Sequence, residues 1–179
     1  MRVVTGLVRF SYVNIFKPKD FGNGDPKYSM LVLIPKDDKK TVSKINSAIK
    51  AAIEDGISSK WGGKKPSNLR TPLRDGDEEK EEPEYEGMYF LNAKSSTRPR
   101  VVDKDLTDIL DPEEVYSGCW GRVALSFYPY DFNGNRGVGV GLENVQKRKD
   151  GEHLGGKRVS ADDDFGDGFE DDDDGGDDF

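Results

Sequence analysis

Apolar and polar residues alternate over several short stretches of the chain, and a period of two predicts half-buried β-strands. In residues 3–12 this pattern places Val8, Phe10 and Tyr12 on one apolar face, with Arg9 on the opposite face. Further alternating or continuously apolar stretches cover residues 28–34, 85–94, 119–130 and 136–146. The chain is therefore expected to form five main strands.

Between residues 38 and 54 the pattern changes to a helical period. The apolar positions of this stretch form one stripe, made of Val42, Ile45, Ile49, Ala52 and Ile53. Asp37 or Asp38 can cap the helix N-terminus, and Gly56 is a natural end. We expect the stripe to pack on the sheet.

The segment 119–130 has the clearest strand pattern. Its core-facing positions are Val123, Leu125 and Phe127, and the opposite face carries Trp120, Arg122, Tyr128 and Tyr130. Turn residues at 131–135 (DFNGN) join this segment to 136–146, which predicts a hairpin. Five strands, one clear helix and long loops predict a mainly β protein, built as a small, partly open five-stranded barrel.

Residues 58–84 lack sustained periodicity and have a basic first half and an acidic second half. A loop of this length in a compact domain is either functional or disordered. Trp61 lies among the lysines of the basic half. Two interpretations fit it equally: a base-stacking group, or an anchor that holds the loop on the core.

Charge is divided unevenly along the chain. The whole chain has a formal net charge of −8, but residues 161–179, here called the acidic segment, contain ten Asp, one Glu and no Lys or Arg. The acidic segment thus carries −11, which leaves +3 on residues 1–160. Beyond residue 148 the chain also lacks the apolar surface that would offset its ordering entropy. We expect a folded domain over residues 1–148 and a disordered acidic tail over residues 149–179.

Composition argues against several classes of protein. With a single Cys (Cys119) and a single His (His153), the chain has no disulfide framework or Cys/His zinc site, and Cys119 is expected to be a reduced, partly buried thiol of an intracellular protein. No apolar run approaches the roughly 20 residues of a membrane helix, and the first residues lack the apolar centre of a signal peptide. The carboxylates lie in flexible runs, and no phosphate-binding glycine motif is present. Catalysis, a cofactor, a metal site and membrane attachment are therefore not expected.

Binding of a single-stranded nucleic acid fits the remaining pattern. Aromatic planes stack on unpaired bases at about 1–3 kcal/mol each, and Arg and Lys neutralise phosphates. The polar face of 119–130 combines both kinds of group, and basic residues elsewhere in the predicted sheet extend a cationic track. The candidate DNA-binding residues are Arg9, Trp61, Lys94, Arg98, Arg100, Trp120, Arg122, Tyr128 and Tyr130.

The acidic segment contains phenylalanines, including the last residue, that a solubilising tail does not need. A terminal Phe179 with its α-carboxylate can insert into an apolar pocket rimmed by basic groups. With Asp174, Asp177 and Asp178 it forms the candidate partner-binding end of the tail. The −11 charge also allows the tail to compete with nucleic acid for a basic groove, and a merely solubilising tail is the alternative.

Five short segments and the DDF end resemble a tailed-phage family of single-stranded-DNA-binding proteins. The segments are SYVNIFKPK near the start, YSMLVLIPK at 28–36, GDE at 76–78, YFLNAKS at 89–95 and GVGLENVQ at 139–146. The resemblance implies an oligonucleotide-binding (OB) Greek-key barrel, sequence-tolerant binding and no catalysis. It also implies a tail that recruits replication or recombination proteins and opposes DNA binding. The usual OB order places the helix between strands three and four, whereas here it follows the second recognisable strand. Either the first strand is broken in two or the helix is an insertion.

The sequence therefore predicts a phage protein that binds single-stranded DNA in the host cytoplasm. Its partners would be the DNA and, through the tail, replication or recombination proteins, and a homodimer or a cooperative assembly on DNA stays open. The alternatives are a protein-interaction adaptor without DNA binding and a metal-dependent nuclease.

Overall fold

The computed structural model describes residues 1–22, 24–154, 165, 166 and 168. Its elements, in chain order, are β1 (Arg2–Val4), β2 (Val8–Lys19), β3 (Lys27–Pro35), α1 (Lys39–Ser59), β4 (Arg74–Asp75), α2 (Gly76–Glu79), η1 (Pro83–Tyr85), β5 (Met88–Ser95), β6 (Val101–Val102), η2 (Pro112–Glu114), β7 (Trp120–Phe132) and β8 (Asn135–Lys149).

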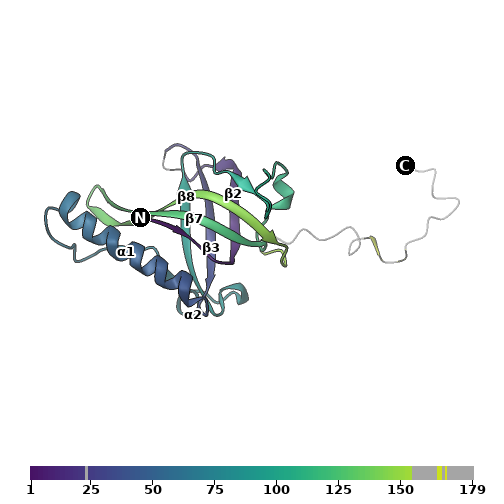
Figure 1. Ribbon diagram of the computed structural model, residues 1–179, viewed down its shortest axis with the longest axis horizontal. Helices are drawn as coiled ribbons and strands as arrows, with labels where there is room; N and C mark the ends of the chain where they lie inside the picture. Colours follow the sequence, from purple (N-terminus) through teal and green to yellow (C-terminus); the bar gives the residue numbers. More distant parts are fainter. Residues whose placement is uncertain (23, 155–164, 167, 169–179) are drawn as a thin grey trace.

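Five long strands pair in a closed ring (Figure 1). β2 pairs antiparallel with β3, β3 with β5, and β7 with both β8 and β2. The ring closes where β5 and β8, which run parallel, pair at Lys94 and Gly141. Three short strands, β1, β4 and β6, enlarge the sheet to eight strands within the described part of the chain. The expected mainly β barrel with one main helix is confirmed, and so is the hairpin, which β7 and β8 form.

The barrel interior is filled by the inward faces of the long strands. Phe10 and Ile15 of β2, Leu91 of β5, and Leu125 and Phe127 of β7 are each 2% exposed or less. Burial of side chains of this size contributes about 1.5–3 kcal/mol each. The inward face predicted for residues 119–130 is therefore correct.

α1 packs against β7, β1 and β8 through the predicted apolar stripe (Figure 1). Its N-cap is Asp38, whose carboxylate accepts a hydrogen bond from the Thr41 backbone N–H at 3.1 Å. The helix does not stop at Gly56, as the sequence suggests, but continues to Ser59. Gly56 instead provides close packing, because a Cβ there would lie 2.6 Å from the Trp61 ring.

The helix position resolves the question of strand order. β1 and β2 are separate strands with a break at residues 5–7, so the single strand expected over residues 3–12 is wrong. Even so, α1 lies between β3 and β5, the second and third strands of the ring. Between the third and fourth ring strands, β5 and β7, the described residues form only β6 and η2. The helix is therefore an insertion relative to the usual OB order.

Candidate nucleic-acid interface

β2 changes its facing at Tyr12. The pairing register with β3 shifts between Ser11 and Asn14, and Tyr12 has a φ of 47°. A bulge of this kind leaves a residue unpaired and re-aims its side chain. Tyr12 is consequently 65% exposed, so its predicted place beside Phe10 on the buried face is wrong, and Ile15 returns to the core after the bulge.

A groove of about 270 Å³ runs beside Tyr12 on the outer face of β2, β3 and β5, opposite the barrel core. Its charged and polar lining consists of Asn14, Lys19, Ser29, Lys80, Asn92 and Lys94. Phe21, from the loop after β2, lines the same groove and is 38% exposed. The Lys94 and Lys19 ammonium groups lie 4.2 Å and 5.5 Å from the Phe21 ring centroid, within cation–π distance. The groove thus combines exposed rings with ammonium groups.

One wall of this groove is built by the segment between α2 and β5. The Tyr85 ring is 5% exposed and packs edge-on against Phe90, with centroids 5.2 Å apart. The Lys80 ammonium lies 5.7 Å from the centroids of both rings. Burial raises the pKa of Tyr85 to about 12, so its phenol stays neutral beside the lysine.

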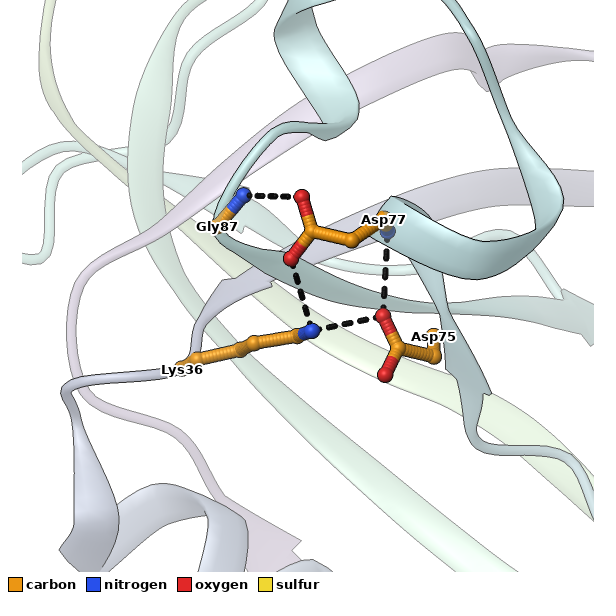
Figure 2. A network of polar contacts seen from close by, with 4 residues as sticks. All are labelled: Lys36, Asp75, Asp77 and Gly87. Atoms are coloured by element: carbon orange, nitrogen blue, oxygen red, sulfur yellow. Dashed lines mark hydrogen bonds and ion pairs between the residues drawn. The ribbon is translucent and has the colours of Figure 1, made fainter.

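A polar network fixes this wall to the rest of the sheet (Figure 2). The Lys36 ammonium, just after β3, donates to Asp75 at 2.6 Å and to Asp77 at 2.7 Å. Asp77 also accepts a hydrogen bond from the Gly87 backbone N–H at 3.0 Å. Hydrogen bonds from Lys36 hold the pKa values of both carboxyls below their usual range. The network ties both ends of the segment that carries Lys80 into place.

Two of the predicted binding residues, Arg9 and Trp120, lie together on this outer face. The Arg9 guanidinium carbon is 5.6 Å from the Trp120 ring centroid, and the Lys149 ammonium is 5.3 Å from it. Arg9 also donates to the backbone carbonyls of Gly118 at 3.0 Å and Glu152 at 2.7 Å. Its guanidinium is thus positioned by backbone acceptors beside the indole.

Trp120 packs against a small apolar cluster that is separate from the main core. The buried members of this cluster are Leu31, Leu33, Tyr85, Met88 and Phe90. Since Tyr85 and Leu31 also line the groove, the cluster joins the Arg9–Trp120 pair to it.

The three predicted basic residues of and after β5 have different surroundings. Lys94 lines the groove. The Arg98 guanidinium carbon is 5.9 Å from the Phe16 ring centroid, over β2. Arg100 forms an exposed ion pair with Asp108 at 2.8 Å, outside the groove.

Tyr128 and Tyr130 lie near the hairpin end of β7, eight and ten residues from Trp120. At about 3.3 Å per residue, Tyr128 is roughly 26 Å from Trp120 along the strand. A Cβ at Gly139 would lie 2.6 Å from Tyr128 Cζ, and one at Gly137 would lie 2.8 Å from Tyr130 Oη. The glycines therefore make room for the tyrosine rings, and neither ring lines the groove.

Arg122 also lies apart from the groove. Its Nε donates to the Thr5 backbone carbonyl at 2.9 Å, and the side chain borders a shallow hollow with Arg2 and Leu106. The sequence placed Arg122 on one face with Trp120, but the two side chains have different neighbours, Thr5 for Arg122 and Arg9 and Lys149 for Trp120.

Trp61 is 4% exposed, and its indole Nε1 donates to the Tyr130 backbone carbonyl at 3.1 Å. Of the two interpretations of this residue, the structure agrees with the loop anchor. The hypothesis that Trp61 stacks on bases is corrected accordingly, because its ring faces are covered by the core.

Residues 150–154, here called the strap, follow β8 and lie against the body. The Gly151 backbone N–H donates to the Tyr116 hydroxyl at 3.1 Å, and the His153 ring stacks on the Tyr116 ring at 4.0 Å. The Leu154 backbone N–H donates to the Ser117 carbonyl at 2.9 Å. Body contacts thus continue past the expected domain end at residue 148. The candidate tail residues Asp174, Asp177, Asp178 and Phe179 lie outside the described residues.

Within the described ranges, no group of three or more His, Cys, Asp or Glu residues could hold a metal ion. None of the helices described is long and apolar enough to cross a membrane. Cys119 is a free thiol that is fully buried rather than partly buried, and burial raises the pKa of this thiol.

A family model described as the ssDNA-binding protein of Enterobacter phage Enc34 matches residues 1–176. The chain belongs to this family. It is 33% identical over 178 residues to protein p50 of Acyrthosiphon pisum secondary endosymbiont phage 1, across 93% of this chain and 94% of that protein.

Solved structures agree with this membership. The Enc34 single-stranded-DNA-binding protein in complex with ssDNA has a TM-score of 0.76 and 30% identity, over 86% of this chain and 89% of that one. Bacteriophage T7 gp2.5, a single-stranded-DNA-binding protein, has a TM-score of 0.61 and 20% identity, over 89% and 97%, and shows the shared fold. The Enc34 family is described as a family of ssDNA-binding proteins. The family resemblance predicted from the sequence is therefore confirmed, and the expectation of a binding protein rather than an enzyme agrees with this family.

Sequence reasoning missed several residues of the groove. Tyr12 was assigned to the core because strict alternation does not register a bulge. Lys19 and Phe21 fall in KPKDF, a segment outside the strands that the alternating pattern predicts. Lys80 lies in an acidic run, and only the folded chain brings it to Tyr85.

Proposed function

We propose that this protein binds single-stranded DNA, without strong sequence preference, in the groove across β2, β3 and β5. The observation that carries the proposal is the combination of exposed rings and ammonium groups, with Lys94 4.2 Å from the Phe21 centroid, in a chain of the Enc34 ssDNA-binding family. Every base offers a π-face, so stacking on such rings tolerates any sequence.

In this proposal Tyr12 and Phe21 stack on bases, and three lysines neutralise phosphates along the groove, namely Lys19, Lys80 and Lys94. Arg9 and Trp120 extend the path beyond Tyr85, because Trp120 packs on the apolar cluster that contains Tyr85. Arg98, over Phe16 of β2, supplies a further cation on a strand that lines the groove. Arg100, Arg122, Tyr128 and Tyr130 are left out of the path, because they neither line the groove nor pack on this cluster.

A titration with oligo-dT at two salt concentrations tests this function. Binding quenches the fluorescence of Trp120, and the affinity falls as salt rises. Lys94→Gln lowers the salt slope by about 0.7, the value for one phosphate contact on a single strand, whereas Lys64→Gln in the exposed loop after α1 leaves it unchanged. Tight duplex binding with no binding to oligo-dT contradicts the proposal, and absence of binding to either DNA favours the adaptor.

We further propose that the folded body ends at the strap and that the acidic segment serves as a regulatory tail. Its terminal residues, Asp174, Asp177, Asp178 and Phe179, would recruit replication or recombination proteins of the phage. Its −11 charge would compete with DNA for the groove lysines. On an oligo-dT that holds one copy, a chain ending at residue 160 then binds more tightly than the full chain at low salt, and equal affinities refute the competition.

A further inference from the structure

The outward face of α1 is a cationic surface that the proposed DNA groove does not use. Residues 39–53 contain four lysines and no acidic residue. These four, Lys39, Lys40, Lys44 and Lys50, are all exposed. No ion pair joins any of them to another residue that the structure describes. This part of the helix therefore presents positive charge that no acidic residue within it offsets, and the acidic residues Glu54 and Asp55 follow in the rest of α1.

A second groove of about 530 Å³, here called the helix groove, lies along this face. Lys39 and Lys50 border it, while the half-buried Val42 and Tyr89 supply apolar surface. At one end Lys36 is already neutralised by its two carboxylates (Figure 2). The helix groove thus combines ammonium groups with a small apolar surface, and the Lys36 ammonium lies 5.1 Å from the Tyr89 ring centroid.

DNA in the main groove is poorly placed to reach the helix groove. The two grooves share no lining residue. Residues 77–84 run from Asp77, a partner of Lys36, to the residue before Tyr85. They contain six acidic residues and one lysine. These carboxylates repel phosphates, so electrostatic repulsion disfavours a nucleic-acid strand that continues from one groove into the other.

The acidic segment of this chain has the matching chemistry. It places Phe165, Phe169 and Phe179 among eleven carboxylates, and Phe165 is 81% exposed. Carboxylates would pair with the α1 lysines, and a phenylalanine would cover Val42 and Tyr89.

The position of the strap favours the acidic segment of a neighbouring copy. Figure 1 shows α1 at one end of the molecule and the end of β8, which leads into the strap, at the other. Twenty-five residues follow Leu154. A flexible chain of this length spans about 28 Å on average, and a fully extended one reaches about 80 Å. A contact from the strap end of one copy to the helix end of the next is head-to-tail, and such contacts build open arrays.

We propose that the helix groove binds the acidic segment of the adjacent copy on the same DNA strand, which makes coating of long single strands cooperative. This inference rests on the proposed DNA binding and names the surface and the segment that link the copies. Charge complementarity also makes the link sensitive to salt, because the lysines involved are exposed.

Binding to short and long oligo-dT tests the proposal with the full chain. The variant Lys39→Gln/Lys44→Gln/Lys50→Gln keeps helix propensity, since Gln and Lys are nearly equal in it. An exposed charge pair contributes about a factor of two, so we expect cooperativity on long oligo-dT to fall about eightfold. Affinity for an oligonucleotide that holds one copy stays unchanged. The matched control Lys60→Gln/Lys64→Gln/Lys65→Gln removes the same charge from the exposed loop and leaves cooperativity intact.

Charge reversal separates pairing from any structural role of the helix. The variant Lys39→Glu/Lys44→Glu/Lys50→Glu loses cooperativity, and adding Asp171→Lys/Asp172→Lys/Asp173→Lys restores it. In equal mixtures of ¹⁴N and ¹⁵N chains on long oligo-dT, carbodiimide then joins α1 lysines to acidic-segment carboxylates in mixed-isotope pairs.

Each other result overturns the inference. Non-cooperative binding by the unmodified chain, or cross-links only within one copy or only to Lys19, Lys80 and Lys94, removes the link between copies. An equal loss of affinity on short and long oligonucleotides makes α1 a DNA contact instead. Absence of any oligo-dT binding by the unmodified chain refutes the proposed function itself. The measurement on short oligonucleotides distinguishes this result from a loss of cooperativity alone.

Discussion

Replacement of Tyr12 by glycine is expected to stabilise the fold and weaken DNA binding at the same time. A non-glycine residue in the left-handed region costs about 1–2 kcal/mol, and Tyr12 has a φ of 47°. Glycine removes that cost but adds about 0.5–1 kcal/mol of unfolded-state entropy. Because the ring is 65% exposed, little burial is lost. The net gain is about 0–1.5 kcal/mol, or a rise in Tm of at most about 6 °C.

The same substitution removes one stacking surface from the groove. Loss of about 1–3 kcal/mol of stacking lowers oligo-dT affinity by about 5- to 150-fold. Tyr12→Phe keeps the ring and should bind like the unmodified protein, while Tyr12→Ala loses binding without relieving the backbone. Thermal melts and fluorescence titrations measure the two effects separately. Unchanged affinity of Tyr12→Gly would refute the stacking role, and a lowered Tm would refute the strain at the bulge.

Three further predictions concern the frame around the groove. Gly56→Ala is expected to lower the free energy of unfolding by about 1–3 kcal/mol in denaturant titrations, although alanine favours helix, because its Cβ would meet the Trp61 ring. Trp61→Ala should cost about 3–5 kcal/mol, yet oligo-dT affinity well below its Tm should match the unmodified protein; a selective loss of affinity would restore the stacking hypothesis. Asp75 and Asp77 have lowered pKa values in the folded state, so their stabilisation is present above the unfolded value of about 3.9 and is lost as pH falls through the lower folded values. Hydrogen exchange of residues 76–87 should become faster between pH 5 and 2 as this stabilisation is lost. If the pH profile of exchange is the same in Asp77→Asn as in the unmodified protein, the prediction is wrong.

The local pattern of apolar and polar residues predicts much of the fold, because the long strands and the helix each have a period that is visible within the segment itself. The inward positions Leu125 and Phe127 and the helix stripe around Ile45 and Ile49 are examples. The bulge at Tyr12 escapes such reasoning, since it depends on the register between two strands rather than on the residues of one.

The candidate site was less accessible to sequence reasoning for the same reason. Lys19 and Phe21 lie at the end of β2 and just after it, Lys80 and Tyr85 lie between α2 and β5, and no local period links the two segments. Trp61 illustrates the opposite case, where composition suggests an exposed ring and tertiary packing buries it.

Closure of the barrel also determines when the protein can complete its folding during synthesis. The Phe10 backbone N–H is satisfied by the Cys119 carbonyl at 2.9 Å, and Val3 pairs with Leu125, so the first strands wait for partners more than one hundred residues downstream. At about 5–20 residues per second, a ribosome needs roughly 5–20 s to produce that stretch. During this interval β2 keeps an open edge, a state that favours chaperone binding or aggregation. The strands that line the groove are made early, but their final shape waits for β7.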